Sequence, residues 1–344
     1  MQREFQFQYT VNDPTIEVSS GQLPQRQPPI VIHRYDDVHR FNDVMDSSLS
    51  ITHTNLLRSF YGHGNNPSYV LYEDYSETLE VYIQNLKTAS GFFKRTVPNV
   101  AGNHSYVNPN IRKLLRYVLK FIKDLHDDNQ CIRGGFDMKN IVMVGRERTP
   151  KFIGVDVIPL SSSSRYEDYR SVRKLIDEIY TGHQLPPELS SLVDALRTYR
   201  KNEVLIHTHA SLWEPEERLN FLRNVVDRKG FLSMNQLTRF YNPALRSMQL
   251  AYIGNWRSRI ASTSRFYQVL HDRRVRNAPY RDNNYSSLVR FLRNAAVHVS
   301  EKTQGGSYLQ ECDIDPVLTT MFPSALVELQ RCLFDAKLTH FWPH

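Results

Sequence analysis

Four polar side chains near the C-terminal end of the chain could together do acid–base chemistry at a phosphate ester. They are a phenol, a guanidinium, an amide and an imidazole: Tyr280, Arg293, Asn294 and His298. An imidazole has an unperturbed pKa of about 6.5, so it can act as a general acid near neutral pH. A guanidinium can hold two phosphate oxygens at once. The set therefore suits a reaction in which a charged phosphorane forms and an alcohol leaves.

The spacing of these residues predicts how they are positioned. The stretch SSLVRFLRNAAVH has the apolar spacing of a helix that buries one face. The buried face is predicted to carry Leu288, Val289, Phe291, Leu292 and Ala296. On such a helix Asn294 and His298 lie on neighbouring turns of one face, with Arg293 at its edge. Tyr280 comes thirteen residues before Arg293, in a loop that begins with a proline.

Each of these residues also has a simpler interpretation. A single histidine on a helix is usually an ordinary surface or core residue, and an Arg-Asn pair is common by chance. The joint occurrence of the four residues, together with the segments described below, favours a site.

The elements that must position the site fall into two groups along the chain. Short β-branched and aromatic runs predict strands at 29–35, 67–75, 140–144 and 151–157. Apolar periodicity predicts helices at 37–49, 111–128, 168–182 and 188–200, and an almost wholly helical remainder. Ser161 to Ser164 reads as a loop. A mixed α+β fold with two units follows, with a boundary near residues 200 to 212.

The excess of positive charge is concentrated in the second group. The chain from Trp213 onward contains 18 Lys and Arg residues and 12 Asp and Glu residues, whereas the preceding chain is nearly balanced, with 25 basic and 24 acidic residues. A local positive excess suits a polyanion such as RNA, although an ordinary basic surface would look the same.

The remaining composition sets broad expectations. Three scattered cysteines, Cys131, Cys312 and Cys332, have neither metal-site spacing nor an even count for disulfides. No long apolar stretch predicts a membrane span, and the polar start is unlike a secretory signal. We expect a cytoplasmic or nuclear protein with a loose leader over residues 1–27, no cofactor and no membrane partner.

The first group resembles the eukaryotic protein kinase fold over roughly residues 28 to 200. The resemblance is carried by the stretches ITHTNLLRSFYG, VLYEDYSETLEVYI, IRGGFDMKNIVMV, KFIGVDV and DYRSVRKLIDEIYTG, in the order in which a kinase has them. Phosphoryl transfer needs a glycine-rich phosphate loop, a lysine, a catalytic base and a magnesium-binding aspartate. No such loop precedes Ile30, and the three other positions hold His33, Gly135 and Gly154. Little chain remains for an activation segment between Val157 and Asp168.

These losses predict a kinase-like domain at 28–206, with a truncated N-lobe and a helical C-lobe, that transfers no phosphate. Asp137 and Asn140 could be remnants of a nucleotide site, but they read more simply as loop residues that bond neighbouring backbone. His53 and Asn55 read as residues of the fold. We expect no nucleotide binding.

The second group resembles the all-α ribonuclease domain of the kinase-extension nuclease (KEN) family over about residues 207 to 334. HTHASLWEPEERLNFLRNVVDR matches the junction that joins kinase and nuclease, YRDNNYSSLVRFLRNAAVH matches the catalytic motif, and DPVLTTMFPSALVEL matches the closing helix. The resemblance implies a nuclease domain at 207–344, with Tyr280, Arg293, Asn294 and His298 on the four active-site positions. It also implies a homodimer that forms through both domains.

The implied reaction is cleavage of RNA by its own 2′-hydroxyl, without a metal, to 2′,3′-cyclic phosphate and 5′-hydroxyl ends. His298 would be the general acid, Arg293 would hold the phosphate and Asn294 would position it. Tyr280 would bond the 2′-hydroxyl or act as base, for which its pKa would have to be lowered by Arg293.

One departure weakens the resemblance. The family's basic turn before the histidine is replaced by Ala295, Ala296 and Val297. The missing charge could come from the upstream arginines, which could equally form a solvated basic face: Arg273, Arg274, Arg276 and Arg281. Tyr285 and Arg290 are weaker candidates for RNA contacts. The alternative to an active nuclease is therefore an inert protein that binds RNA or a related kinase-nuclease as a regulator.

Three histidines could suggest a metal site: His207, His209 and His271. No cysteine or carboxylate is spaced with them in a ligand pattern, and the RNA chemistry above needs no metal. We expect none.

Overall fold

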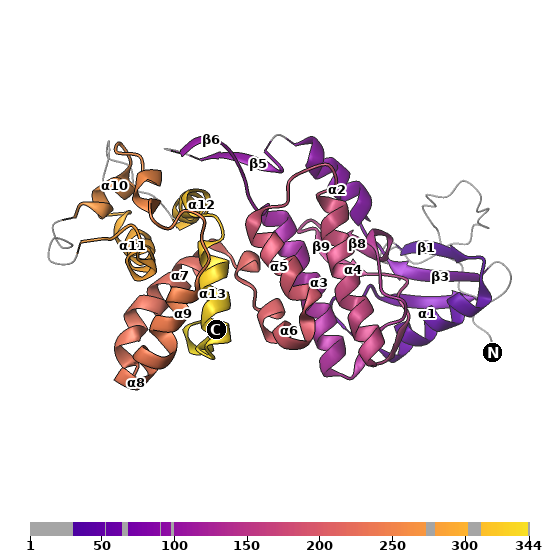
Figure 1. The fold of residues 1–344 in the computed structure, drawn as a ribbon. Coiled ribbons are helices and arrows are strands. Elements are labelled where there is room, and N and C mark those ends of the chain that lie inside the picture. Colours follow the sequence, from indigo (N-terminus) through magenta and orange to yellow (C-terminus); the bar gives the residue numbers. More distant parts are fainter. Residues whose placement is uncertain are drawn as a thin grey trace. The chain divides into compact units, whose positions relative to one another are not determined.

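The computed structural model describes residues 30–51, 53–63, 68–89, 91–97, 100–272, 279–301 and 311–342. The predicted leader at 1–27 lies outside these ranges. The chain divides into two compact units, 1–89 with 114–179 and 90–113 with 180–344, which are described separately (Figure 1). The domain boundary at residues 206 and 207 remains a sequence-based prediction. The two helices before it, between residues 187 and 207, belong to the second unit by their contacts.

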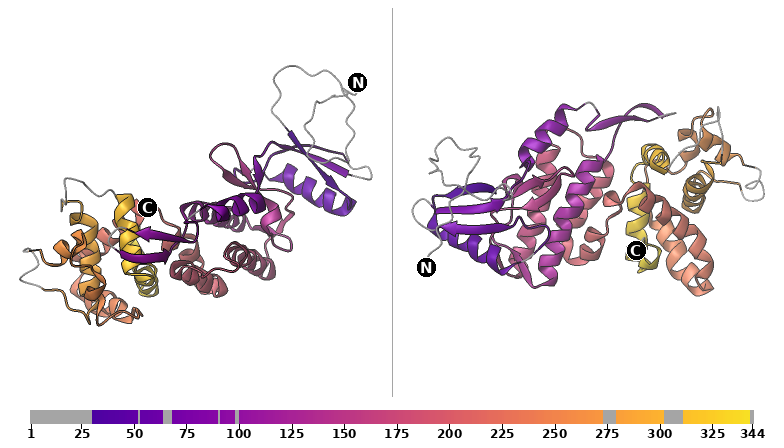
Figure 2. Two further views of the ribbon diagram at one scale, coloured as in Figure 1. Left: turned by 90° about the horizontal axis from the view of Figure 1, so that it is seen from above. Right: turned by 180° about the vertical axis from the view of Figure 1, so that it is seen from behind.

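The first unit contains a three-stranded antiparallel sheet. Its order is β1 (Ile30–Tyr35), β3 (Ser68–Glu73) and β2 (Ser59–His63). Helix α1 (Val38–Ser50) packs against this sheet, as two views agree (Figures 1 and 2). Asp37 caps α1 by accepting from the backbone N–H of His39 at 2.8 Å, so a short polar side chain begins this helix. One small core includes Phe41, Leu57, Val70, Tyr72, Val142 and Ile153.

The rest of the first unit consists of two small sheets of short strands and of helices. The strands are β4 (Glu77–Thr78), β8 (Ile141–Val144) and β9 (Thr149–Phe152) in one sheet, and β7 (Gln130–Ile132) with β10 (Val157–Pro159) in another. The helices are α2 (Leu79–Thr88), α4 (Ser162–Ile179) and most of α3 (Pro109–Asp127). The apolar residues at helical spacing in α3, including Ile111, Leu114, Leu115 and Val118, are buried. This burial confirms the amphipathic helix predicted at 111–128.

Three predictions at this level were wrong. Ser162 to Ser164 form the first turn of α4 instead of a loop, because the Ser161 hydroxyl accepts from the backbone N–H of Ser164 at 3.1 Å and starts the helix. The strand predicted at 151–157 ends at Phe152, since Gly154 has φ +62° and interrupts it. The helix predicted at 188–200 is broken at Thr198 into two helices.

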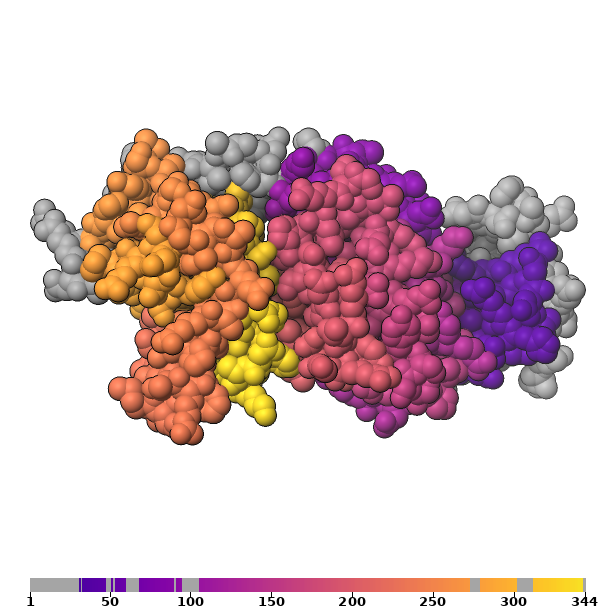
Figure 3. Space-filling view, in the orientation of Figure 1, coloured from indigo at the N-terminus to yellow at the C-terminus, as the bar shows by residue number. Residues whose placement is uncertain are grey.

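Where the second unit is described, it consists mostly of helices and includes a hairpin, β5 (Lys94–Val97) with β6 (Val100–Ser105). Sequence analysis missed this hairpin and β2. The helices are α5 (Pro187–Arg197), α6 (Tyr199–His207), α7 (Pro215–Asp227), α8 (Met234–Gln236), α9 (Asn242–Ser247), α10 (Arg265–Leu270), α11 (Tyr285–His298), α12 (Glu311–Met321) and α13 (Ala325–Asp335). The space-filling view shows the residues of α7 to α9 mostly at the bottom of the orange region and later, lighter orange residues above them (Figure 3).

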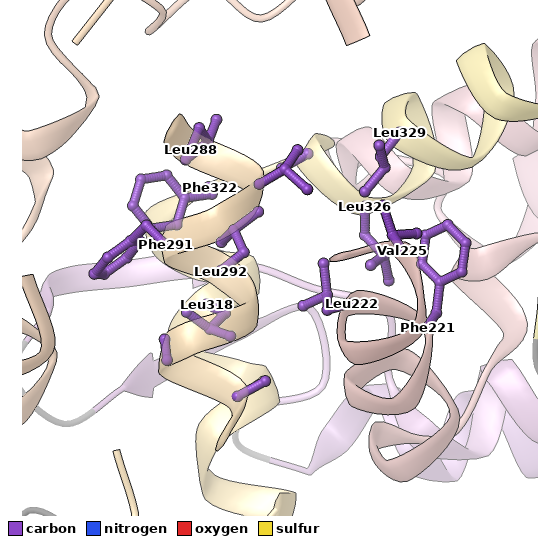
Figure 4. Packing of buried hydrophobic residues seen from close by; sticks show 14 of the residues in the cluster. Phe221, Leu222, Val225, Leu288, Phe291, Leu292, Leu318, Phe322, Leu326 and Leu329 are labelled. Atoms are coloured by element: carbon purple, nitrogen blue, oxygen red, sulfur yellow. The ribbon is translucent and has the colours of Figure 1, made fainter. Parts of the chain in front are cut away.

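The core of the second unit lies among α7, α11, α12 and α13 (Figure 4). Buried side chains from all four helices belong to one cluster, including Leu222, Leu292, Leu318 and Leu329. Burial of a leucine or phenylalanine contributes roughly 1.5–3 kcal/mol, so this cluster fixes how α11 lies against α7.

The architecture is a mixed α+β fold, mostly helical, with small antiparallel sheets, as expected from the sequence. Among the described residues, no helix is both long and apolar enough to traverse a lipid bilayer.

Candidate active site

Helix α11 carries three of the four predicted site residues, and its sequence explains its start and its orientation. The Asn284 side chain accepts from the backbone N–H of Ser287 at 2.9 Å, which caps the first turn. The predicted apolar face is buried, including Phe291 and Leu292. Because that face is in the core, Arg293 and His298 lie at its margin, where their side chains are 23% and 24% exposed.

Three of the four residues are joined by hydrogen bonds. The Asn294 amide nitrogen donates to the Tyr280 hydroxyl at 2.7 Å. The Asn294 amide oxygen accepts from Arg293 Nη1 at 3.2 Å. Asn294 therefore positions both the Tyr280 phenol and the Arg293 guanidinium by hydrogen bonds from a single residue of α11.

The Arg293 guanidinium has a further partner on α7. Its Nε and Nη2 atoms both lie 2.8 Å from Asp227 Oδ1. The carboxylate fixes the guanidinium from the side opposite Asn294. It is also an anion that a phosphate would have to compete with or displace.

The surroundings of Tyr280 decide its protonation. The ring is 4% exposed and packs edge-on against Trp256 and Phe291, while the Arg290 guanidinium lies 4.7 Å from its centroid. Burial raises the pKa of Tyr280 above its ordinary value, and the hydrogen bond from Asn294 and the nearby arginines only partly oppose this shift.

This finding corrects one expectation. Arg293 does lower the pKa of Tyr280, but its effect is small beside that of burial, so the phenol does not become a base near neutral pH. Because the hydroxyl oxygen accepts from Asn294, its proton can be donated to a substrate oxygen.

His298 lies one helical turn beyond Asn294, four residues on, which places both side chains on one side of α11. Its Nδ1 atom is 3.0 Å from Glu301 Oε1. That contact orients the ring and leaves Nε2 as the nitrogen that can face a substrate. In the described part of the chain, His298 makes no hydrogen bond or ion pair with Tyr280, Arg293 or Asn294.

Two acidic residues at this site were missed by sequence analysis. Asp227 was noted as part of the junction motif but not as a partner of Arg293, and Glu301 was not noted. Glu301 follows His298 by three residues, a spacing that could have suggested the contact. The Asp227 contact had no local signal, since the two partners are 66 residues apart.

A groove of about 460 Å³ runs beside the N-terminal half of α11. Its lining residues come from α7 and the segment after it, from α9 and the turn before it, and from α11 and the segment that leads into it: Val226, Lys229, Tyr241, Leu245, Pro279, Arg281, Asn284, Ser286, Ser287, Val289 and Arg290. The predicted RNA-binding residue Arg281 is exposed on this groove. The other three, Arg273, Arg274 and Arg276, lie outside the described residues. Tyr285 packs partly against the core.

In the first unit, two of the three predicted lost kinase positions, Gly135 and Gly154, have backbone conformations that disfavour any side chain. Gly135 has φ +75°, and a Cβ there would lie 2.2 Å from the Ser171 hydroxyl. Gly154 has φ +62°, with the Tyr35 hydroxyl 3.2 Å from an added Cβ. His33 Nε2 is 3.1 Å from the Tyr75 hydroxyl, and burial lowers the pKa of this histidine.

Asp137 and Asn140 bond the backbone around them. The Asp137 carboxylate accepts from the N–H of Lys139 at 2.8 Å, and the Asn140 amide nitrogen donates to the carbonyl oxygens of Ile153 and Gly154. Both residues line a pocket of about 570 Å³ in the first unit. There Asp156 forms an ion pair with Arg133, so that carboxylate is already neutralised.

Two of the three histidines that could suggest a metal site, His209 and His271, have other surroundings. His209 is buried between the hydroxyls of Ser211 and Ser191, at 2.8 and 3.3 Å, and His271 lies against the ring of Tyr267. In the described part of the chain no three or more His, Cys, Asp or Glu side chains are grouped as metal ligands.

Comparison with known proteins gives no family assignment. Neither protein-family models nor curated proteins match this chain.

Proposed function

We propose that this chain is a metal-independent endoribonuclease with a KEN-like domain behind an inactive kinase-like domain. The observation that carries the proposal is the hydrogen-bonded series from Tyr280 through Asn294 to Arg293, with His298 one turn further along the same helix. A phenol, an amide and a guanidinium held in one arrangement can bind a phosphodiester and its neighbouring hydroxyl.

In the proposed reaction, the 2′-oxygen of the RNA attacks the adjacent phosphorus and the bond from phosphorus to the 5′-oxygen breaks. Neutral Tyr280 donates a hydrogen bond to a substrate oxygen, and Arg293 stabilises the negative phosphorane. The 2′-proton passes to solvent, while protonated His298 gives its Nε2 proton to the leaving 5′-oxygen. The products are a 2′,3′-cyclic phosphate and a 5′-hydroxyl.

The kinase-like assignment of the first unit belongs to the same proposal. The inactivity proposed for this unit is supported by Gly135 and Gly154, where the backbone conformation and the neighbouring hydroxyls disfavour an acidic side chain. The proposed role of this unit is to support a homodimer. Cleavage per protomer should then rise with protein concentration.

The test is incubation of a stem-loop RNA with the full chain in EDTA, followed by analysis of the product ends. We expect cleavage to persist in EDTA and to fall by roughly 10²–10⁴-fold in His298→Ala and in Arg293→Ala. Matched controls are His271→Ala and Arg239→Ala, which replace exposed residues of the same types outside the site. Cleavage that disappears in EDTA, or that the site variants leave unchanged, would refute the proposal.

One observation favours the alternative of an inert RNA-binding or protein-binding regulator. Arg293 is already paired with Asp227, and the residues after Asn294 are apolar, with Ala295 and Ala296 buried. In that case wild-type protein would bind the stem-loop RNA without cutting it at any concentration.

A further inference from the structure

Basic residues, and no acidic ones, line the groove beside α11. Three of these residues are basic, Lys229, Arg281 and Arg290, and none is Asp or Glu. The surrounding sequence has the same character, because residues 228–271 contain seven Lys and Arg residues and no Asp or Glu. Such a surface attracts a polyanion.

The groove is directly connected to the candidate active site. Pro279 and Arg281, which flank Tyr280 in the chain, both line it. Arg290 lines it as well, and its guanidinium lies over the Tyr280 ring at 4.7 Å. A strand whose scissile phosphate reaches Tyr280 and Arg293 therefore has this groove as its neighbouring surface.

The rest of the lining suits a nucleotide. The volume of about 460 Å³ is within the range of small-molecule sites. Pro279 and Val226 supply apolar surface for a base or sugar, while Asn284 and Ser286 supply hydrogen-bonding groups. Binding should depend mainly on the phosphate backbone, because contacts from basic residues to phosphates carry no base sequence information.

We infer that this groove is an RNA subsite that binds the nucleotide next to the scissile phosphate, with Lys229, Arg281 and Arg290 on its backbone phosphate. The inference rests on the proposed function, because it assigns the substrate strand a path across that same site. Lys229 reaches the groove from the segment after α7, where its ammonium lies 5.6 Å from the centroid of the Tyr241 ring.

The binding test uses the full chain and a fluorescent single-stranded RNA with 2′-O-methyl groups throughout, which cannot be cleaved. The groove variant is Lys229→Gln with Arg281→Gln. The control is Arg239→Gln with Arg246→Gln, which removes two exposed cations of the same acid-free segment that do not line the groove. The thermal midpoint of each protein is measured first, and a groove variant that is less stable is replaced by the single variant Arg281→Gln.

We expect the groove variant to bind at least about tenfold more weakly than the control at low salt. The slope of log affinity against log salt should fall by about 0.7 for each lost phosphate contact. Equal losses in the groove variant and the control would overturn the inference. Polyglutamate that competes as well as RNA of the same length would also overturn it.

A cleavage test separates this inference from the proposed function. A dinucleoside monophosphate offers the active site its scissile bond without a further phosphate for the groove. We expect the groove variant to lose much more activity on a long RNA, through a raised KM, than on this dinucleoside monophosphate. If His298→Ala is inactive while the groove variant keeps a wild-type KM on long RNA, the nuclease stands and the subsite is refuted.

Discussion

Arg293 is held between two partners, and they have different consequences for a bound phosphate. Asn294 is neutral, so it positions the guanidinium without reducing its charge. Asp227 is an anion whose side chain is 49% exposed, and an exposed ion pair of this kind contributes about 0–1 kcal/mol. A substrate phosphate can therefore displace this carboxylate at small cost.

Asp227→Asn should make substrate binding tighter. The asparagine keeps a hydrogen-bond acceptor for Arg293 and removes the competing charge, so we expect KM for RNA to fall about two- to fivefold with kcat unchanged. Steady-state cleavage kinetics of the full chain measure both constants, with Asp282→Asn as a control carboxylate paired to another arginine. A tenfold loss of kcat would instead show that Asp227 positions Arg293 for the reaction.

His209 predicts a specific loss of stability in acid. Burial, with a smaller contribution from Arg218, lowers the pKa of this histidine in the folded protein to about 3, from its ordinary value of 6.5. The unfolded chain therefore binds a proton that the folded chain does not. The stabilisation is complete above pH 6.5 and is lost as pH falls towards 3, at about 1.4 kcal/mol per pH unit.

His209→Asn removes this proton uptake and keeps an acceptor for the backbone N–H of Ser211. Urea unfolding at pH 6.5 and pH 5 should show wild type losing about 2 kcal/mol more than the variant. Equal losses in both proteins would mean that the ring is not kept neutral by the fold.

At the scale of elements, α7 is joined to α5 and α12 by a buried cation. The Arg218 guanidinium forms ion pairs with Glu188 and Asp315 and also donates to the Ala210 carbonyl oxygen at 2.7 Å. All of its side chain but about 1% is buried, so its charge is compensated within the protein. The network fixes the start of α7, whose last residue is Asp227.

Arg218→Met should destabilise the protein by about 3–5 kcal/mol, because two buried carboxylates lose their partner. Chemical unfolding measures the change, and Arg239→Met serves as an exposed control. Adding Glu188→Gln and Asp315→Asn to Arg218→Met should recover part of the loss. A loss below 1 kcal/mol in the single variant would contradict the assigned burial and pairing.

At the scale of the whole molecule, the proposal of an inactive kinase-like unit beside a nuclease domain predicts that nucleotides do not stabilise the chain. In the first unit, Gly135 and Gly154 leave no acidic side chain at two positions where the proposed kinase likeness would require one, and Asp156 is paired with Arg133. We expect the melting temperature to be unchanged by millimolar ATP with magnesium, measured by thermal scanning of the full chain. A rise of several degrees would indicate binding far above background.

Local pattern was sufficient for α11 and α3. Apolar spacing predicted both helices and which of their faces is buried. It could do so because the buried face of a helix consists of apolar residues spaced three and four positions apart in the sequence. It did not predict the hairpin β5–β6 or the break at Thr198. A short strand has a weak pattern, and a helix break depends on what surrounds it.

The sequence by itself determined the residue types of the candidate site and the helix that carries Arg293, Asn294 and His298. Only the tertiary structure decided which contacts these residues make: Asp227 on Arg293 across 66 residues, and a buried ring around the Tyr280 hydroxyl whose pKa is raised. The physical reason is that helix periodicity depends on near neighbours in the chain. Ion pairing and burial depend on segments that only packing of the core brings together.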